Sequence, residues 1–155
     1  MKTLRDSTKP ISHIFHISDI HIRLFHRQKE YDCVFQKFYE YVSNFSTGNH
    51  VIVITGDILH SKNELSPECC QQTLDFLQNC AALYPTLFIL GNHDCLLNNL
   101  DRIDSLSSIL YERTIQDLYF LRSSDVYLFD NVAFYVDSLI DDLSPFVQTA
   151  PPNVV

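Results

Sequence analysis

The chain has 155 residues, of which 46% are apolar and 19% charged, with a formal net charge of −8 at pH 7. This composition excludes a disordered chain, and the length suits one domain that buries roughly 70% of the surface of the unfolded chain. Residues 1–50 hold seven Lys/Arg and five Asp/Glu, whereas residues 51–155 hold four and fourteen. The acidic balance excludes strong non-specific binding of nucleic acid over the whole surface, so any such contact must be local.

Cysteine usage and hydropathy bear on the compartment of the protein. The five cysteines are odd in number and lack paired metal-ligand spacing, which is typical of reduced thiols in a cytosolic or nuclear protein. The first residues contain no apolar core of a secretory signal, and no run approaches the roughly 18 apolar residues of a membrane span. We therefore expect a cytoplasmic or nuclear protein that is not secreted and has no membrane partner.

Three short apolar runs, at residues 13–19, 50–57 and 86–92, predict β-strands. Two helices are predicted between them. Apolar residues with helical spacing form one face of the first helix, of about four turns: Tyr31, Val34, Phe35, Phe38, Val42 and Phe45. The second helix has an apolar face of the same kind: Cys70, Leu74, Leu77 and Ala81. Ser66 can cap it, with Pro67 at its first position and Pro85 beyond its end. Alternating strands and helices predict a parallel sheet covered by helices.

The pattern changes after residue 95. A helical segment is predicted near residues 103–113, followed by three β-like runs at 117–121, 126–130 and 131–139 that turn residues separate. The sequence contains no repeat or linker that would divide the chain. Residues 145–155 have the composition of an irregular tail, so we expect a single domain.

Potential metal ligands follow each of the three predicted strands: Asp19 and His21, then Asp57 and His60, then Asn92, His93 and Asp94. In an open parallel sheet the carboxyl ends of neighbouring strands meet at one edge, where such folds bind ligands. We therefore expect these side chains to converge. Gly56 and Gly91, at the same strand ends, allow sharp turns and a close approach of the backbone to an ion or phosphate.

This mixture of donors predicts a particular chemistry. Carboxylates, an amide and imidazoles suit Mn²⁺, Fe or Zn²⁺ better than Mg²⁺, which prefers an all-oxygen shell. Two such ions, roughly 3.5–4 Å apart, clamp a phosphoryl group and activate water. His93, next to Asn92, is free to stabilise the transition state or protonate the leaving oxygen. We expect the remaining histidines to be ordinary core or surface residues: His13, His16, His26 and His50.

The three blocks, D-I-H at 19–21, G-D-I-L-H at 56–60 and G-N-H-D at 91–94, resemble the first signature blocks of the calcineurin-like metallophosphoesterases. Within that superfamily, residues 17–41 and 91–106 resemble the nuclease subunit of the double-strand-break repair nuclease–ATPase complex, the SbcD type with its viral and phage members. The resemblance covers about residues 12–140. It implies the N-terminal portion of a four-layer α/β/β/α fold, a β-sandwich flanked by helices with the site at its mouth.

The resemblance also implies roles for the strand-end residues. Asp19 and His21 would bind one metal ion, Asp57 would bridge two ions and Asn92 would bind the second. His93 would be the catalytic histidine, Asp94 would orient it, and His60 would lie behind the ligands. The implied cofactors are two divalent ions, Mn²⁺ first, with Fe, Zn²⁺ or Mg²⁺ as alternatives. The implied partners are a DNA substrate, an ABC-type ATPase subunit and a second copy of the chain in a homodimer.

The basic run at residues 23–29 is the best local candidate for a nucleic-acid contact in this acidic chain. It follows the first metal ligands directly, so we expect Arg23, His26 and Arg27 to contact DNA phosphates. The alternative is a solvated loop with no such role.

One departure from the family pattern affects the functional prediction. Family members complete the site with a histidine on a later strand and a Gly-His-x-His block, yet all seven histidines here lie at or before position 93. We interpret residues 1–155 as a single incomplete domain with its core at about 12–140, and expect an exposed sheet edge.

Our interpretation of its function is the N-terminal part of a Mn²⁺-dependent DNA exonuclease or endonuclease of repair or recombination, inactive as this chain alone. The alternatives are a small-molecule or protein phosphoesterase of the same superfamily and a non-catalytic remnant.

Overall fold

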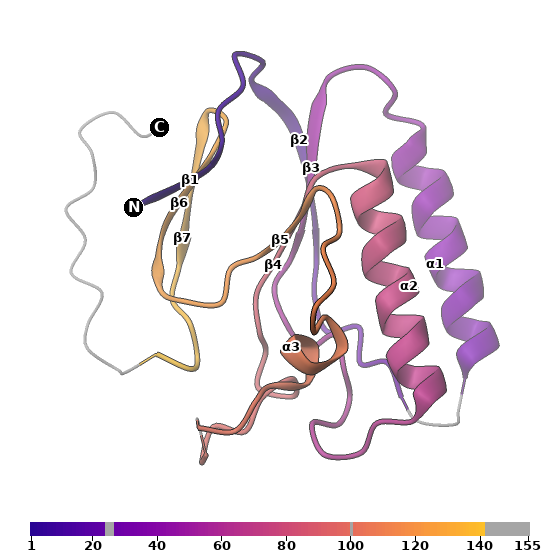
Figure 1. The fold of residues 1–155 in the computed structure, drawn as a ribbon. Coiled ribbons are helices and arrows are strands. Elements are labelled where there is room, and N and C mark those ends of the chain that lie inside the picture. Colours follow the sequence, from indigo (N-terminus) through magenta and orange to yellow (C-terminus); the bar gives the residue numbers. More distant parts are fainter. Residues whose placement is uncertain (24–26, 100, 142–155) are drawn as a thin grey trace.

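Three layers make up the structure, a computed structural model that describes residues 1–23, 27–99 and 101–141. Two long helices cover one face of a four-stranded sheet, and a three-stranded sheet lies on its other face (Figure 1). This mixed α/β arrangement, with a parallel and a mixed sheet flanked by helices, confirms the predicted fold class.

The four-stranded sheet is parallel throughout and has the order β2-β3-β4-β5. Its strands are β2 (Ile11–Ile17), β3 (Asn49–Ile54), β4 (Thr86–Phe88) and β5 (Leu118–Phe120). Ile17 pairs with Ile54, Ile54 with Phe88, and Phe88 with Phe120. The four strands therefore end at the same level, and the loops that follow them start side by side at the lower end of the sheet in Figure 1. β5, predicted as an isolated run, joins this sheet.

Helix α2 (Pro67–Leu83) follows its sequence signals closely. The Ser66 hydroxyl caps it by accepting a hydrogen bond of 3.2 Å from the Cys69 amide, and Pro67 occupies the first helical position. The helix ends two residues before Pro85. Its buried face packs on the sheet in the larger of two hydrophobic clusters, which also holds core residues of β3 and β4.

Helix α1 (Gln28–Ser43) lies beside α2 on the same face of the sheet (Figure 1). Phe35 and Val42 on its predicted apolar face are buried. Val34, predicted to belong to the same face, is instead 60% exposed.

The three-stranded sheet has the order β1-β6-β7 and consists of β1 (Lys2–Arg5), β6 (Asp125–Phe129) and β7 (Val132–Val136). β6 and β7 form the antiparallel hairpin expected from the two last β-like runs, whereas β1 runs parallel to β6. β1 was not predicted, because a run of four residues with three polar ones has no strand periodicity of its own. Tyr127 and Phe129 of this sheet pack against Val51 and Leu87 of the other in the second hydrophobic cluster.

The helix predicted near residues 103–113 is much shorter than expected. Helix α3 spans only Ser105–Ile109. The Asp104 carboxylate caps it by accepting a 2.7 Å hydrogen bond from the Ser107 amide. Helical geometry ends at Leu110, with φ −90° and ψ 4°, and Glu112 takes a left-handed conformation with a φ of 55°.

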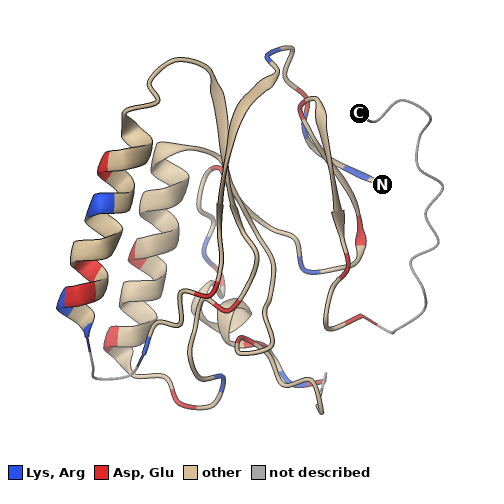
Figure 2. Ribbon diagram, turned by 180° about the vertical axis from the view of Figure 1, so that it is seen from behind, with Lys and Arg blue, Asp and Glu red and all other residues tan. Residues whose placement is uncertain are grey.

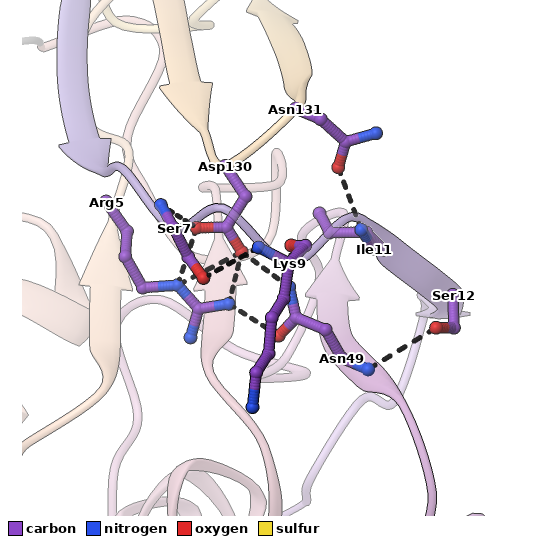
Figure 3. Close-up of polar contacts among 8 residues, drawn as sticks. All are labelled: Arg5, Ser7, Lys9, Ile11, Ser12, Asn49, Asp130 and Asn131. Atoms are coloured by element: carbon purple, nitrogen blue, oxygen red, sulfur yellow. Dashed lines mark hydrogen bonds and ion pairs between the residues drawn. The ribbon is translucent and has the colours of Figure 1, made fainter.

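A buried ion pair fastens the two sheets together at the end opposite to the carboxyl ends of the parallel strands (Figure 3). The Asp130 carboxylate, in the β6–β7 turn, has a fully buried side chain. It accepts hydrogen bonds from the Arg5 guanidinium and from the Ser7 amide, the latter at 3.0 Å. Asn49, at the start of β3, donates its side-chain amide to Asp130 over 2.7 Å and accepts from Arg5 over the same distance. We call Arg5, Asn49 and Asp130 the sheet clamp.

All five cysteines are free thiols. Burial raises the pKa of the Cys69 thiol to about 11 and that of Cys80 to about 12, so both remain protonated and unreactive at neutral pH. In the part of the chain that the structure describes, no helix has the length and apolar character needed to cross a membrane.

Candidate metal centre

The loops after β2 and β3 bring Asp19, His21 and Asp57 together at the predicted edge of the sheet. One potential ligand atom from each lies within 4.8 Å of the others. His21 Nε2 is 3.8 Å from Asp19 Oδ1 and 3.9 Å from Asp57 Oδ2. Since metal–ligand bonds to imidazole and carboxylate are about 2.0–2.2 Å long, atoms at these separations can share one ion. We call these three residues the carboxylate group.

A second group of donors shares His21 with the first. His21, His60 and His93 also offer ligand atoms within 4.8 Å of one another. The His93 ring stacks on His60 with centroids 5.8 Å apart, and meets His21 edge-on at 4.7 Å. His60, expected to lie behind the ligands, is therefore as close to the site as the other two imidazoles. We call this set the imidazole group.

Buried nitrogen atoms support metal binding at this place. Among the described residues, neither His21 Nδ1 nor His60 Nδ1 has a hydrogen-bond partner, although both atoms are buried. An unsatisfied buried polar atom costs about 1–3 kcal/mol. A divalent ion at the imidazole group would satisfy such a nitrogen. The mixed oxygen and nitrogen donors fit an ion of intermediate hardness such as Mn²⁺, Fe or Zn²⁺.

The backbone of the carboxylate group is unusual. Asp19, His21 and Asp57 all have left-handed conformations, with φ angles of 56°, 51° and 52°, a region that residues other than glycine seldom adopt. Hydrogen bonds between the two loops hold this geometry. The His21 amide donates to Asp57 O over 3.0 Å, and the Ile22 amide donates to Ile58 O over 2.8 Å. Backbone outliers held by their surroundings are typical of functional sites.

Gly56 and Gly91 are required because the loops after β3 and β4 touch there through their backbones. A Cβ atom on Gly56, whose φ is 90°, would lie 2.5 Å from Gly91 N. A Cβ atom on Gly91 would lie 2.1 Å from Asp57 Oδ1 and 2.2 Å from Asp57 N. We expected the glycines to admit an ion or a phosphate. Instead they allow the loops to approach each other and leave room for the Asp57 carboxylate.

Gly91→Ala is therefore expected to weaken Mn²⁺ binding by about tenfold or more, because the new methyl group must displace Asp57 from the carboxylate group. Calorimetric titration with MnCl₂ measures the affinity. Gly48→Ala is the matched control, since Gly48 has a φ of 116° and a Cβ there would lie 2.8 Å from Ser12 Oγ, at the other end of the sheet. Both variants should be less stable, but only Gly91→Ala should bind Mn²⁺ more weakly. Equal affinities would contradict the role given to Gly91.

Asp94 joins the loops after β3 and β4. Its buried carboxylate accepts hydrogen bonds of 2.9 Å from the amides of Leu59 and Gly91. Burial raises the pKa of Asp94, and these amides oppose the rise. His93 Nδ1 donates to the backbone oxygen of His60 over 2.8 Å, and the orienting role expected for Asp94 stays a prediction.

His93 is fixed at a second point, because its amide donates to Asp57 Oδ1 over 2.9 Å. Asn92, beside it, is exposed and remains a predicted ligand. Lys62, which we did not single out from the sequence, donates to the backbone oxygen of Asn92 over 3.3 Å. Lys62 therefore adds a positive charge to the loops around the two groups. In the sequence, only the position of Lys62 after His60, in the same loop, indicated that it lies near the site.

Of the three residues predicted to contact DNA, Arg23 and Arg27 belong to the described residues, and the third, His26, lies outside them. Burial lowers the pKa of His60, and the positive charge of Arg23 lowers it further. Burial raises the pKa of Tyr31, and the charges of Arg23 and Arg27 act against this rise. Both arginines are exposed, and Figure 2 shows basic and acidic segments mixed among the loops at the lower end of the sheet.

The remaining described histidines lie along β2 and β3 and make ordinary contacts. His50 is buried and its Nε2 lies 3.0 Å from Thr47 O, and His13 Nδ1 lies 3.3 Å from His50 Nδ1. His16 Nε2 lies 2.9 Å from Thr55 Oγ1. None of the three belongs to the carboxylate group or to the imidazole group.

Comparison with known proteins agrees with this geometry. Residues 12–146 match the model of the family described as calcineurin-like phosphoesterase. The chain is also similar to a protein of Acanthamoeba polyphaga mimivirus named "Uncharacterized protein R555", with 42% identity over 145 residues. The match covers 92% of this chain and 11% of that protein, so the chain spans about a ninth of its relative. With the family match over most of its length, the chain belongs to the calcineurin-like phosphoesterases.

Proposed function

We propose that this chain carries the metal centre of a two-metal phosphodiesterase that hydrolyses DNA with Mn²⁺. The family implies a metal-dependent hydrolase. The observation that carries the finer proposal is the pair of overlapping donor groups, joined at His21, with basic side chains around them. When bound, two divalent ions would neutralise phosphate charge and activate water for in-line displacement.

The residues of the chain supply rigidity and a proton donor. Asp57 is held through the His93 amide on one carboxylate oxygen, and its other oxygen faces His21. His93 donates its Nδ1 proton to His60 O, so Nε2 is the nitrogen left to exchange a proton with the leaving oxygen. Both contacts fix the site before substrate binds, which limits the loss of entropy in the reaction.

Basic residues favour DNA over a small phosphoester as the substrate. Arg23 and Arg27 follow Asp19 and His21 in the sequence, and Lys62 donates to the backbone oxygen of Asn92, in a chain whose net charge is −8. A phosphodiester backbone presents several phosphates that such residues can contact, whereas a small phosphoester needs none beyond the metal centre. The resemblance to the repair nuclease extends the proposal to an ABC-type ATPase partner, a homodimer and a cytoplasmic or nuclear location.

We expect little or no turnover by this chain alone. In the assignment that the resemblance implies, the second ion has only Asp57 and Asn92 as protein ligands, and His93 of the imidazole group serves as a proton donor and not as a ligand. Two-metal catalysis needs both ions held rigidly. The assay is hydrolysis of bis(p-nitrophenyl) phosphate and of DNA with and without MnCl₂. Turnover at an enzyme-like rate, or Mn²⁺-independent hydrolysis, would contradict this allocation of ligands.

Arg27→Ala tests the DNA contact. We expect weaker oligonucleotide binding in the presence of Mn²⁺. The slope of log K against log salt concentration should also fall in magnitude by ~0.9 on duplex DNA, which corresponds to the loss of about one phosphate contact. Lys9→Ala is the control, because Lys9 is also exposed but precedes β2 at the far end of the sheet. An unchanged slope for Arg27→Ala, or an equal change for Lys9→Ala, would exclude the proposed contact.

A further inference from the structure

We propose that a pocket beside the metal centre holds a flat aromatic ring, such as a nucleobase, of the phosphoester bound there. This inference rests on the proposed function and names the part of the substrate that the site selects. The pocket has a volume of about 350 Å³ and lies between the end of β2 and the first turns of α1. The residues that carry the inference line it: Asp19, Tyr31, Val34, Phe35, Phe38 and Phe76. We call it the aromatic pocket.

Asp19 belongs to the wall of the aromatic pocket and to the carboxylate group, so the two sites are adjacent. The Ser18 hydroxyl, also in the pocket wall, donates to Asp19 Oδ2 over 2.6 Å. The other carboxylate oxygen, Oδ1, faces His21 Nε2. The Asp19 side chain is 69% exposed. A phosphate at the metal centre therefore has the pocket directly beside it.

The walls of the pocket suit an aromatic ring. Phe35 and Phe76 are buried with ring centroids 4.4 Å apart, and Tyr31 packs on Phe35 at 5.8 Å. Tyr31 and Phe38 are half-buried and leave part of their rings open to the pocket. Aromatic side chains bind further rings by stacking or edge-to-face contact, and nucleobases of any sequence bind in this way.

Charges at the pocket favour one orientation of the substrate. Asp19 and Glu30 are the ionisable carboxylates in its lining, and no lysine or arginine is among the described lining residues. A phosphate group would be repelled from this pocket and attracted to the metal ions. The Tyr31 hydroxyl also donates to the backbone oxygen of His21, which fixes the pocket wall to a ligand of both donor groups. The volume is near the lower end of the ~300–1,000 Å³ range of small-molecule sites, which suits a single ring system better than a protein segment.

Val34 gives the inference a direct test, because it lines the pocket and is 60% exposed. With Mn²⁺ present, affinities are measured by calorimetry for methyl phosphate, which reports the metal centre alone, and for 1-naphthyl phosphate, which adds a ring. We expect 1-naphthyl phosphate to bind about tenfold more tightly than methyl phosphate. In Val34→Trp and in Val34→Glu this advantage should disappear, while the affinity for methyl phosphate stays the same.

Tyr41→Trp is the matched control, since Tyr41 lies on the same helix with 61% exposure but outside the pocket. It should keep the tenfold advantage. If Val34→Trp fails to fold, Val34→Glu still tests the pocket, because an exposed helical position accepts glutamate. Equal affinities for the two phosphates in the unchanged chain, or an equal loss in Tyr41→Trp, would overturn the inference and leave the metal centre standing.

A metal-free measurement separates failure of this inference from failure of the proposed function. Without Mn²⁺, 1-naphthol should shift NMR signals of residues 17–20 and 30–38, because the ring alone fits the aromatic pocket. Failure of methyl phosphate to bind in Mn²⁺ would count against the proposed function but not against these shifts. Shifts spread over the whole chain, or none at all, would overturn the aromatic pocket.

Discussion

Asp57→Ala is expected to abolish metal binding and any Mn²⁺-dependent hydrolysis together. Asp57, a member of the carboxylate group, is also tied to the loop after β4, because its Oδ1 accepts a hydrogen bond from the His93 amide. We expect the unchanged chain to bind one Mn²⁺ ion with modest affinity through the carboxylate group. Loss of Asp57 should weaken this binding by more than ~100-fold, beyond the effect of removing a residue that only supports a ligand. Calorimetry and metal analysis of the same preparation measure it.

His93→Ala provides the contrast. In a protein that joins this chain to the histidine-bearing region of family members, we expect it to reduce Mn²⁺-dependent turnover by ~10²–10⁴, the range for a positioned acid, while the metal content stays nearly intact. His93 is a member of the imidazole group, so this outcome decides between a proton donor and an ion ligand. If His93→Ala removes metal as completely as Asp57→Ala, His93 is a ligand. An unchanged metal stoichiometry in the double variant Asp19→Ala, Asp57→Ala would refute the carboxylate group itself.

Arg5→Ala is expected to lower the free energy of unfolding by about 3–5 kcal/mol at pH 7. It leaves the Asp130 carboxylate buried without its counter-ion, and Asn49 loses a donor at the same time. Urea unfolding measures the effect. Lys2→Ala is the control on the same strand, because Lys2 pairs with Asp125 at 3.7 Å on the exposed surface and such pairs contribute about 0–1 kcal/mol. Equal effects would show that the sheet clamp does not fasten the sheets.

Acid should weaken the sheet clamp. The Arg5 guanidinium holds the pKa of Asp130 below its ordinary value of 3.8. A carboxylate whose pKa is lower in the folded state than in the unfolded state contributes its full stabilisation at pH values above the unfolded-state pKa. This contribution is lost as the pH falls through the folded-state pKa. The difference in stability between the unchanged chain and Arg5→Ala should therefore be constant near neutrality and shrink below about pH 4. Urea unfolding at pH 7 and pH 3 compares the two, and a difference that grows in acid would contradict this account.

The parallel sheet and its helices could be predicted because their signals are local. Apolar periodicity, the Ser66 cap and Pro67 each act within one turn or one strand, and they give β2, α1, β3, α2 and β4 in the right order. β1 could not be found in this way, because its partner β6 is remote and only that pairing makes Lys2–Arg5 a strand. The early end of α3 was missed because Leu110 already leaves helical geometry, with φ −90° and ψ 4°, and the sequence gives no strong sign of it.

The location of the candidate site could be predicted from the sequence, but several contacts within it could not. Strand ends of a parallel sheet converge by geometry, so Asp19, His21 and Asp57 could be expected together. His60 differs, because its position follows from a bridge between Ile22 and Leu59 that aligns two loops beyond the strands. The bonds of Asp94 to Leu59 and Gly91 depend on the same loop contact. Periodicity does not describe contacts between loops, so these roles needed the structure.

The parallel pairing of β1 with β6 has a consequence for how the protein is made. β1 leaves the ribosome first, but Arg5 and Asp130 are 125 positions apart, so the strand must wait for a partner that is synthesised much later. The helical side can assemble earlier, because β2, α1, β3, α2 and β4 follow one another and pair in turn. Non-local pairings form slowly, and until β6 arrives the apolar side chains of Val51 and Leu87 lack their cover. We therefore expect nascent chains that stop before Asp125 to bind chaperones and aggregate, although they already contain every proposed metal ligand.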